Sequence, residues 1–194
     1  MKHNGLIFIP DISGFTQFVT SVDFKHGQHI IQELLEIILD ANQMGLTASE
    51  VEGDAILFYR FGELPDLKVT YKQVEKMFLS FHKHLELYQS RRTCHCNACI
   101  SAIHLSLKII THYGEFTEYR IKNFLTLFGK DIIIAHQLLK NDIPQHEYWL
   151  ITNDLSGGKP PEKFTPSINW NKGTKQVNND EIAFHFTRLS HLKK

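Results

Sequence analysis

The sequence has no excess of charge of either sign, since 21 lysines and arginines stand against 21 aspartates and glutamates in 194 residues. A chain without net charge has no long-range field that attracts nucleic acid or an anionic membrane, so we expect neither as a partner. Long apolar runs are also missing, because none approaches the roughly 20 residues that a membrane span requires. The first run, "LIFI", is too short for a signal peptide and is followed directly by Pro10. We therefore expect a cytoplasmic protein.

Cysteine is scarce, and the three cysteines, Cys94, Cys96 and Cys99, all fall in one segment, "CHCNAC". Disulfides are disfavoured in the cytoplasm, so we do not expect them here. Three thiolates bind Zn²⁺ when a histidine completes a tetrahedral site. The candidates for that fourth ligand are His95, His82 and His84. The alternative is a loop of reduced thiols, because the spacing C-x-C-x₂-C is not the paired CxxC pattern of well-defined zinc sites.

The content of 42% hydrophobic residues and the length of the chain fit one well-filled domain. We expect a single domain over residues 1–194, with a core at about 6–152 and a C-terminal loop and strand at 153–194. Apolar residues at spacings of three and four predict helices, and short apolar or alternating runs between turn residues predict strands. The expected elements are a strand at 6–9 ended by Pro10 and Asp11, a helix ending near Asn42, a hairpin at 46–61 turning on Gly53 and Asp54, a helix at 66–88, strands at 100–111 and 116–127 joined around "HYGEF", a helix at 131–140, a strand at 147–152, a long loop at 153–180 and an edge strand at 181–189.

This order of elements predicts an α+β fold of ferredoxin-like βαββαβ type. Its sheet is expected to be mainly antiparallel, with helices on one face and extra strands at the C-terminal end.

Two aspartates occupy places where neighbouring strands of such a sheet meet. Asp11 follows a strand and Asp54 lies in a hairpin turn, so the two carboxylates are expected close together. Hard oxygen ligands favour Mg²⁺ or Mn²⁺, which often also hold nucleotide phosphates. The segment Ser13-Gly14-Phe15-Thr16 opens a helix whose first backbone N–H groups attract phosphate. Together these features indicate a nucleoside triphosphate site, although an Asp followed by Ser and Gly is also typical of a plain turn and helix cap.

Four segments in the same order resemble motifs of the class III adenylate and guanylate cyclases. They are "FIPDISGFTQFV", "EVEGDAILFY", "THYGEF" and "LTLFGKDIIIAHQLLKN". The resemblance covers about residues 6–141, and within bacteria the sequence is most similar to an uncharacterised cyclase-like family. It implies a cyclase-type fold and a dimer with the active sites at its interface.

The resemblance also implies roles for particular residues. Asp11 and Asp54 would be metal ligands, with the carbonyl of Ile12 as a third. Gly14, Phe15 and Thr16 would form the phosphate-binding segment. Glu50 would read the purine base together with Thr126, and a glutamate there is similar to the guanylate-selective type. A Glu-Thr pair differs from the usual guanylate set, so the choice between ATP and GTP stays open.

Two positions depart from the cyclase pattern. Cyclases carry an asparagine four residues after the glycine that corresponds to Gly129, and an arginine four residues further on. Ile133 and Gln137 occupy these positions here, and neither side chain can take over the orientation of the ribose or the compensation of charge on the α-phosphate. Losing one preorganised donor typically costs about 10²–10³ in rate.

Three hypotheses for function follow. The first is a regulatory cyclase-like domain that binds metal and nucleotide, or only a partner, with degenerate or no cyclase activity as a homodimer. The second is an active cyclase that forms a cyclic nucleotide, or the metal-bearing half of a heterodimer with a cyclase-like partner. The third is a purely structural or interaction module whose two aspartates no longer have a role.

Overall fold

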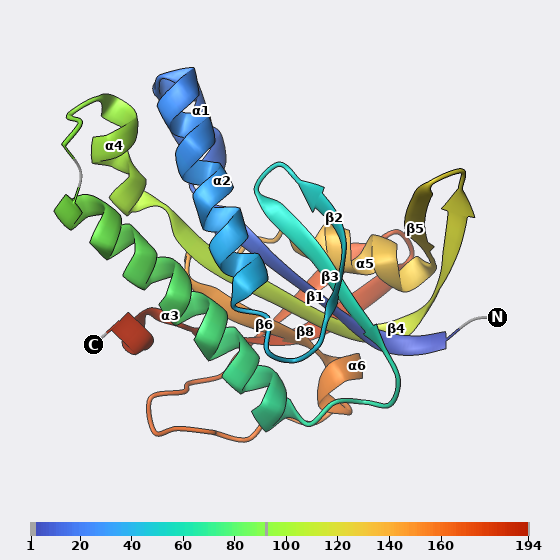
Figure 1. Ribbon diagram of the computed structural model, residues 1–194. Coiled ribbons are helices and arrows are strands. Elements are labelled where there is room, and N and C mark those ends of the chain that lie inside the picture. Colours follow the sequence, from blue (N-terminus) through green and yellow to red (C-terminus); the bar gives the residue numbers. More distant parts are fainter. Residues whose placement is uncertain (1–2, 92, 194) are drawn as a thin grey trace.

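The computed structural model describes residues 3–91 and 93–193, which form an eight-stranded sheet with helices packed against it (Figure 1). The strands are β1 His3–Ser13, β2 Thr47–Glu52, β3 Ala55–Phe61, β4 Ser106–Ile121, β5 Phe124–Phe128, β6 Tyr148–Thr152, β7 Asn171–Val177 and β8 Asp180–Arg188. The helices are α1 Phe15–Ser21, α2 Phe24–Asp40, α3 Leu67–Arg91, α4 Asn97–Ser101, α5 Lys130–Leu138 and α6 Asn153–Ser156, with short 3₁₀ helices η1 Ala102–His104 and η2 Ser190–Lys193. None of the helices in these described residues has the length and apolarity of a membrane span.

The strand order across the sheet is β2-β3-β1-β4-β6-β8-β7, and β5 pairs with the second half of β4. Strands β4 and β6 run parallel, whereas the other pairs are antiparallel. The structure therefore confirms the predicted α+β class with a mainly antiparallel sheet.

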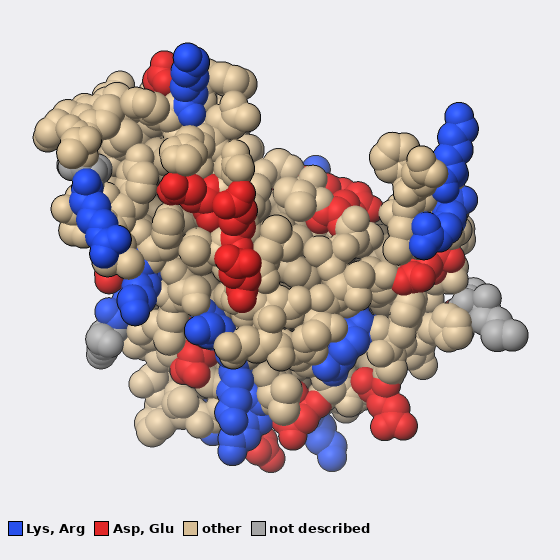
Figure 2. All heavy atoms as spheres, in the orientation of Figure 1, with Lys and Arg blue, Asp and Glu red and all other residues tan. Residues whose placement is uncertain are grey.

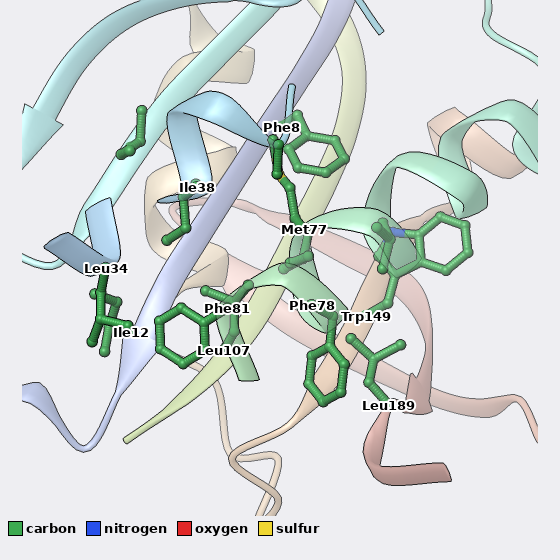
Figure 3. Close-up of a cluster of buried hydrophobic side chains, with 14 of the residues drawn as sticks. Phe8, Ile12, Leu34, Ile38, Met77, Phe78, Phe81, Leu107, Trp149 and Leu189 are labelled. Carbon is green, nitrogen blue, oxygen red and sulfur yellow. The ribbon is translucent and has the colours of Figure 1, made fainter. Parts of the chain in front are cut away.

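Both faces of the sheet are covered, which corrects the expectation of helices on one face only. Successive side chains of β1 point to opposite faces. Leu6 and Phe8 pack on the side of α2 and α3, together with Met77 (Figure 3). Ile7 and Ile9 pack on the other side, with apolar residues of α5. A strand that is apolar on both sides needs two cores, and α5 supplies the cover of the second one.

Strand β1 is longer than predicted and runs through Pro10 and Asp11 to Ser13. Its ladder with β4 is continuous, from His3 opposite Phe116 to Ser13 opposite Ser106. On the other edge, the ladder with β3 has no pair at Ile9 or Pro10 and resumes where Asp11 lies opposite Ala55. Proline has no N–H to donate, so it fits a place where one ladder is interrupted. Asp11 thereby lies inside a paired strand instead of after it.

The predicted strand boundaries around "HYGEF" were wrong. This segment lies within the single strand β4, and the turn to β5 comes later, at Lys122 and Asn123. Lys122 has a φ of +54°, as tight turns often require. Residues 97–104, whose last five were expected in a strand, are helical. Pairing with β1 extends β4 at its start, and pairing with β5 extends it at its end, so local turn signals inside it are overridden.

Two predictions about the C-terminal part also need correction. The expected loop at 153–180 contains β7, and β8 is an internal strand between β6 and β7. The sequence of β7, "NKGTKQV", is mostly polar, which suits a strand at the sheet edge where most side chains are exposed. An edge strand of this kind carries little hydrophobic signal.

The hairpin prediction was correct. Glu52 pairs with Ala55, so Gly53 and Asp54 form the two-residue turn. Gly53 has a φ of +63°, a conformation that favours glycine, and this fixes where Asp54 leaves the turn.

Candidate functional site

Asp11 and Asp54 lie side by side where β1 meets the β2–β3 turn. The backbone N–H of Ile12 donates to the carbonyl oxygen of Asp54 with an N···O distance of 2.9 Å. The negative charge of Asp54 acts on the carboxyl of Asp11, which is only 8% exposed. The structure thus brings together the two carboxylates that the sequence analysis paired.

Lys108 is a member of this site that the sequence analysis missed. It lies opposite Asp11 in the ladder between β1 and β4. Its Nζ is 3.4 Å from Oδ1 of Asp11 and 3.3 Å from the carbonyl oxygen of Leu139. A lysine inside the otherwise apolar run "LSLKII" was the available signal, because a charge in a central strand needs a partner.

Burial is the main reason why the carboxyl of Asp11 is hard to ionise. Loss of solvation raises its pKa from 3.8 to about 6, and the charge of Asp54 acts in the same direction, although the ammonium of Lys108 opposes both. Loss of solvation likewise raises the pKa of Asp54. One nearby lysine therefore compensates this pair of carboxylates only in part.

We expect the metal-free protein to lose stability as Asp11 ionises. The pKa of Asp11 is higher in the folded than in the unfolded chain, so the protonated carboxyl contributes to the free energy of unfolding. This contribution is complete below pH 4 and is lost as the pH rises through 6, on the order of 3 kcal/mol in all. Between pH 5 and pH 7.5 the free energy of unfolding should fall by roughly 1 kcal/mol through this effect. Urea unfolding of the parent and of Asp11→Asn at both pH values measures it. The stability of Asp11→Asn should fall less over this range, and equal slopes in the two proteins would contradict the assignment.

The aspartates and Lys108 open into a cleft of about 670 Å³. This volume is in the range of small-molecule sites. The predicted phosphate-binding residues Gly14, Phe15 and Thr16 line it, at the start of α1. Figure 2 shows the molecule hollowed between the α1–α2 side and the β4–β5 hairpin. The cleft also receives basic side chains that were not predicted, namely those of His136, Lys140 and His146.

The predicted base-reading residues lie together, beside the cleft. Thr126 in β5 is close enough to Glu50 in β2 for its side chain to act on the Glu50 carboxyl. Loss of solvation, followed by the neighbouring Glu52, raises the pKa of Glu50. Glu52 itself lines the cleft and is 3.5 Å from Nδ1 of His136. The two strands that carry Glu50 and Thr126 are thus close enough for the pair to act on one ligand.

Ile133 and Gln137 lie one turn apart on α5, as the spacing of four requires. Gln137 lines the cleft, whereas Ile133 is 52% exposed and is not among the residues that line it. Neither side chain carries a charge. At the position where the cyclase pattern has an arginine, the cleft has the uncharged Gln137.

The three cysteines form a second cluster at α4, a helix that lies on the other side of α1 and α2 from the β2–β3 hairpin (Figure 1). Cys94 and Cys96 lie before α4 and Cys99 lies within it, and none of the three is in a disulfide. The histidine that joins them is His26, near the start of α2. The three histidines proposed from the sequence are not part of the cluster. His95 is exposed, His82 is buried beside Glu147, and His84 lies next to Glu33.

The chain has the fold of class III cyclase catalytic domains. The guanylyl cyclase Cya2 superposes with a TM-score of 0.66 at 12% identity, over 96% of this chain and 92% of that one. The adenylyl cyclase CyaB from P. aeruginosa gives 0.58 at 16% identity, over 98% and 96% of the two chains. The guanylate cyclase domain of RhGC from Catenaria anguillulae, solved in complex with GTP, gives 0.62 at 14% identity, over 96% and 97%. At such identities the likeness establishes the fold alone.

The chain belongs to the family described as "Protein of unknown function (DUF2652)", which matches residues 31–148. The uncharacterized protein Rv2561/Rv2562 of Mycobacterium tuberculosis is 32% identical over 121 residues. That match covers 62% of this chain and 56% of the relative, so the chain spans little more than half of the relative's length.

Proposed function

We propose that this chain binds a nucleoside triphosphate together with Mg²⁺ or Mn²⁺ in the cleft, and that it acts as a regulatory domain with little or no cyclase turnover as a homodimer. The observation that carries the proposal is the pair of partly compensated carboxylates, Asp11 and Asp54, beside the start of α1. Such a pair offers hard oxygen ligands to a divalent ion, and the ion leaves positions for phosphate oxygens.

The residues present fit a divalent ion. Asp11 and Asp54 provide carboxylate oxygens, and Ile12, whose carbonyl is the third candidate ligand, directly follows Asp11 in the chain. The ammonium of Lys108 already contacts Asp11, so the site has an affinity for positive charge. When bound, the ion would neutralise the carboxylates and the phosphate oxygens, and in a competent cyclase it would activate the attacking hydroxyl.

The remaining lining suits an anionic phosphate chain. Lys108 in β4 and Lys140, two residues beyond the end of α5, contribute positive charge. The first N–H groups of α1, at Phe15 and Thr16, have no partner within their own helix, because no earlier turn provides a carbonyl. Glu50 and Thr126 are our candidates for contacts with the base, and ATP and GTP remain equal alternatives at this pair.

The side chains of α5 argue against efficient catalysis by this chain alone. Stabilisation of the charge that develops in cyclisation needs preorganised donors at that place. Ile133 offers an aliphatic group and Gln137 an uncharged amide. A homodimer would have the aspartates in both subunits but the asparagine and arginine of the cyclase pattern in neither.

A heterodimer is the second candidate, and exposed apolar side chains offer a surface to a partner subunit. On the β4–β5 hairpin, Phe124 is 76% exposed and Phe128 is 69% exposed. At the start of α2, Phe24 is 78% exposed. These exposed side chains on the hairpin and on α2 favour a partner of the same fold, with the hairpin of each subunit packed on the α1–α2 side of the other. A cyclase-like partner with asparagine and arginine in its α5 would complete one active site.

Titration with ATP and GTP in the presence of Mn²⁺ tests the proposed binding. A ligand at 100 times its dissociation constant stabilises the native state by about 2.7 kcal/mol. For a chain of this size we expect the melting temperature to rise by roughly 5–10 °C with the preferred nucleotide and Mn²⁺ together. The matched control is nucleotide without a divalent ion, which should give a much smaller rise. No shift with any nucleoside triphosphate would contradict the proposal.

A further inference from the structure

The four side chains His26, Cys94, Cys96 and Cys99 present four metal-binding atoms to one point. Each residue offers one such atom, and all four atoms lie within 4.8 Å of one another. His26 comes from α2, about seventy positions before the cysteines in the chain. Local sequence therefore does not bring His26 to the cysteines. The packing of α2 against α4 and the residues just before it does so.

Four of the distances between these atoms are close to the edges of a tetrahedron around Zn²⁺. With ordinary Zn–S and Zn–N bonds, a tetrahedral site has S···S edges of about 3.8 Å and S···N edges of about 3.6 Å. Sγ of Cys96 is 3.4 Å from Sγ of Cys99. Nδ1 of His26 is 3.0 Å from Sγ of Cys96, 3.6 Å from that of Cys94 and 4.0 Å from that of Cys99. We propose that His26, Cys94, Cys96 and Cys99 form a structural zinc site of the Cys₃His type.

Neighbouring donors support the thiolates in this arrangement. The backbone N–H of Cys96 donates to Sγ of Cys94 at 3.4 Å. The hydroxyl of Tyr88 lies 3.2 Å from Sγ of Cys99, and Nε2 of Gln89 donates to the carbonyl oxygen of Cys99 at 2.9 Å. Hydrogen bonds of this kind orient metal ligands and balance the charge on sulfur.

The composition of the cluster indicates zinc and a structural role. Thiolates with one imidazole select a soft or borderline ion such as Zn²⁺, whereas Mg²⁺ and Mn²⁺ prefer the oxygen ligands of the aspartate pair. Four protein ligands fill a tetrahedral shell and leave no position for a substrate. A cavity of about 420 Å³ that reaches Cys94 and Cys99 gives the ion a way in. The ion would tie the first turn of α2 to the connection between α3 and α4.

The zinc site is independent of the proposed nucleotide site, and two variants of the full chain test it. Protein purified without chelators should contain about one zinc per chain by elemental analysis. His26→Gln should lower zinc affinity at least tenfold, since even loss of an outer contact often costs that much. His95→Gln is the matched control, because it removes a histidine next to two ligands yet outside the cluster, and it should keep the zinc.

Cobalt binding to the parent protein gives a second readout that does not depend on how the variants fold. Replacement of zinc by Co²⁺ should produce the strong visible absorption of a tetrahedral site and the sulfur-to-cobalt charge-transfer band of several thiolates. Equal zinc loss in His26→Gln and His95→Gln would overturn the assignment of the fourth ligand. Metal-free parent protein with no tetrahedral cobalt spectrum would overturn the site, and so would a Cys96–Cys99 disulfide found by mass spectrometry in protein prepared under reducing conditions.

Discussion

The substitution Asp54→Asn is expected to abolish the rise in melting temperature that Mn²⁺ and a nucleoside triphosphate give to the parent protein. Asparagine keeps the size of the side chain and removes the charge that offsets a divalent ion. Asp54 lies in a turn and is only half-buried, so the fold should tolerate the change. The parent is expected to gain roughly 5–10 °C, and the variant close to nothing. Differential scanning fluorimetry with and without Mn²⁺ provides the measurement.

Two comparisons make this result specific. Asp40→Asn changes an exposed aspartate at the end of α2, outside the cleft, and should leave the nucleotide response unchanged. Zinc content measured on the same samples should be equal in both variants, because the thiol cluster does not share residues with the cleft. If Asp54→Asn binds Mn²⁺ and nucleotide as tightly as the parent does, the nucleotide site lies elsewhere.

The double substitution Ile133→Asn with Gln137→Arg is expected to raise cyclase activity with Mn²⁺ above that of the parent. It restores the two groups that the cyclase pattern has in α5, and Ile133 and Gln137 are both exposed, so the core is untouched. Each preorganised donor is typically worth about 10²–10³ in rate, and we expect a gain of at least about 10²-fold if the subunits pair as cyclases do. Formation of cyclic nucleotide from ATP and from GTP, followed by chromatography, measures it.

The controls for this gain use the same background. Ile133→Ala with Gln137→Ala changes the same positions without adding donors and should stay as inactive as the parent. Adding Asp54→Asn to the activating pair should remove the gained activity, which separates it from a contaminating cyclase. A parent homodimer that already turns over at ordinary enzyme rates, about 1–10³ s⁻¹, would show that Ile133 and Gln137 do not disable the site.

The sequence by itself determined the elements whose signals are local. The apolar spacing in α2 and α3 predicted both helices, because a helix that covers a sheet must place apolar residues along one stripe. The pair Gly53 and Asp54 predicted its hairpin turn, because glycine there tolerates the positive φ that the turn needs. The close spacing of the three cysteines and the replacement of the cyclase asparagine and arginine by Ile133 and Gln137 could likewise be read directly.

Tertiary structure alone decided which distant residues meet. Strand register places Lys108 opposite Asp11, and nothing near either residue in the sequence specifies that pairing. The approach of α2 to α4 selects His26 as the neighbour of the cysteines, although His82, His84 and His95 are much closer to them in sequence. The continuity of β4 and the existence of the polar strand β7 also depend on their pairing partners. The reason is physical: a strand is stabilised by hydrogen bonds and side-chain contacts to other strands, so its limits and neighbours are properties of the whole sheet.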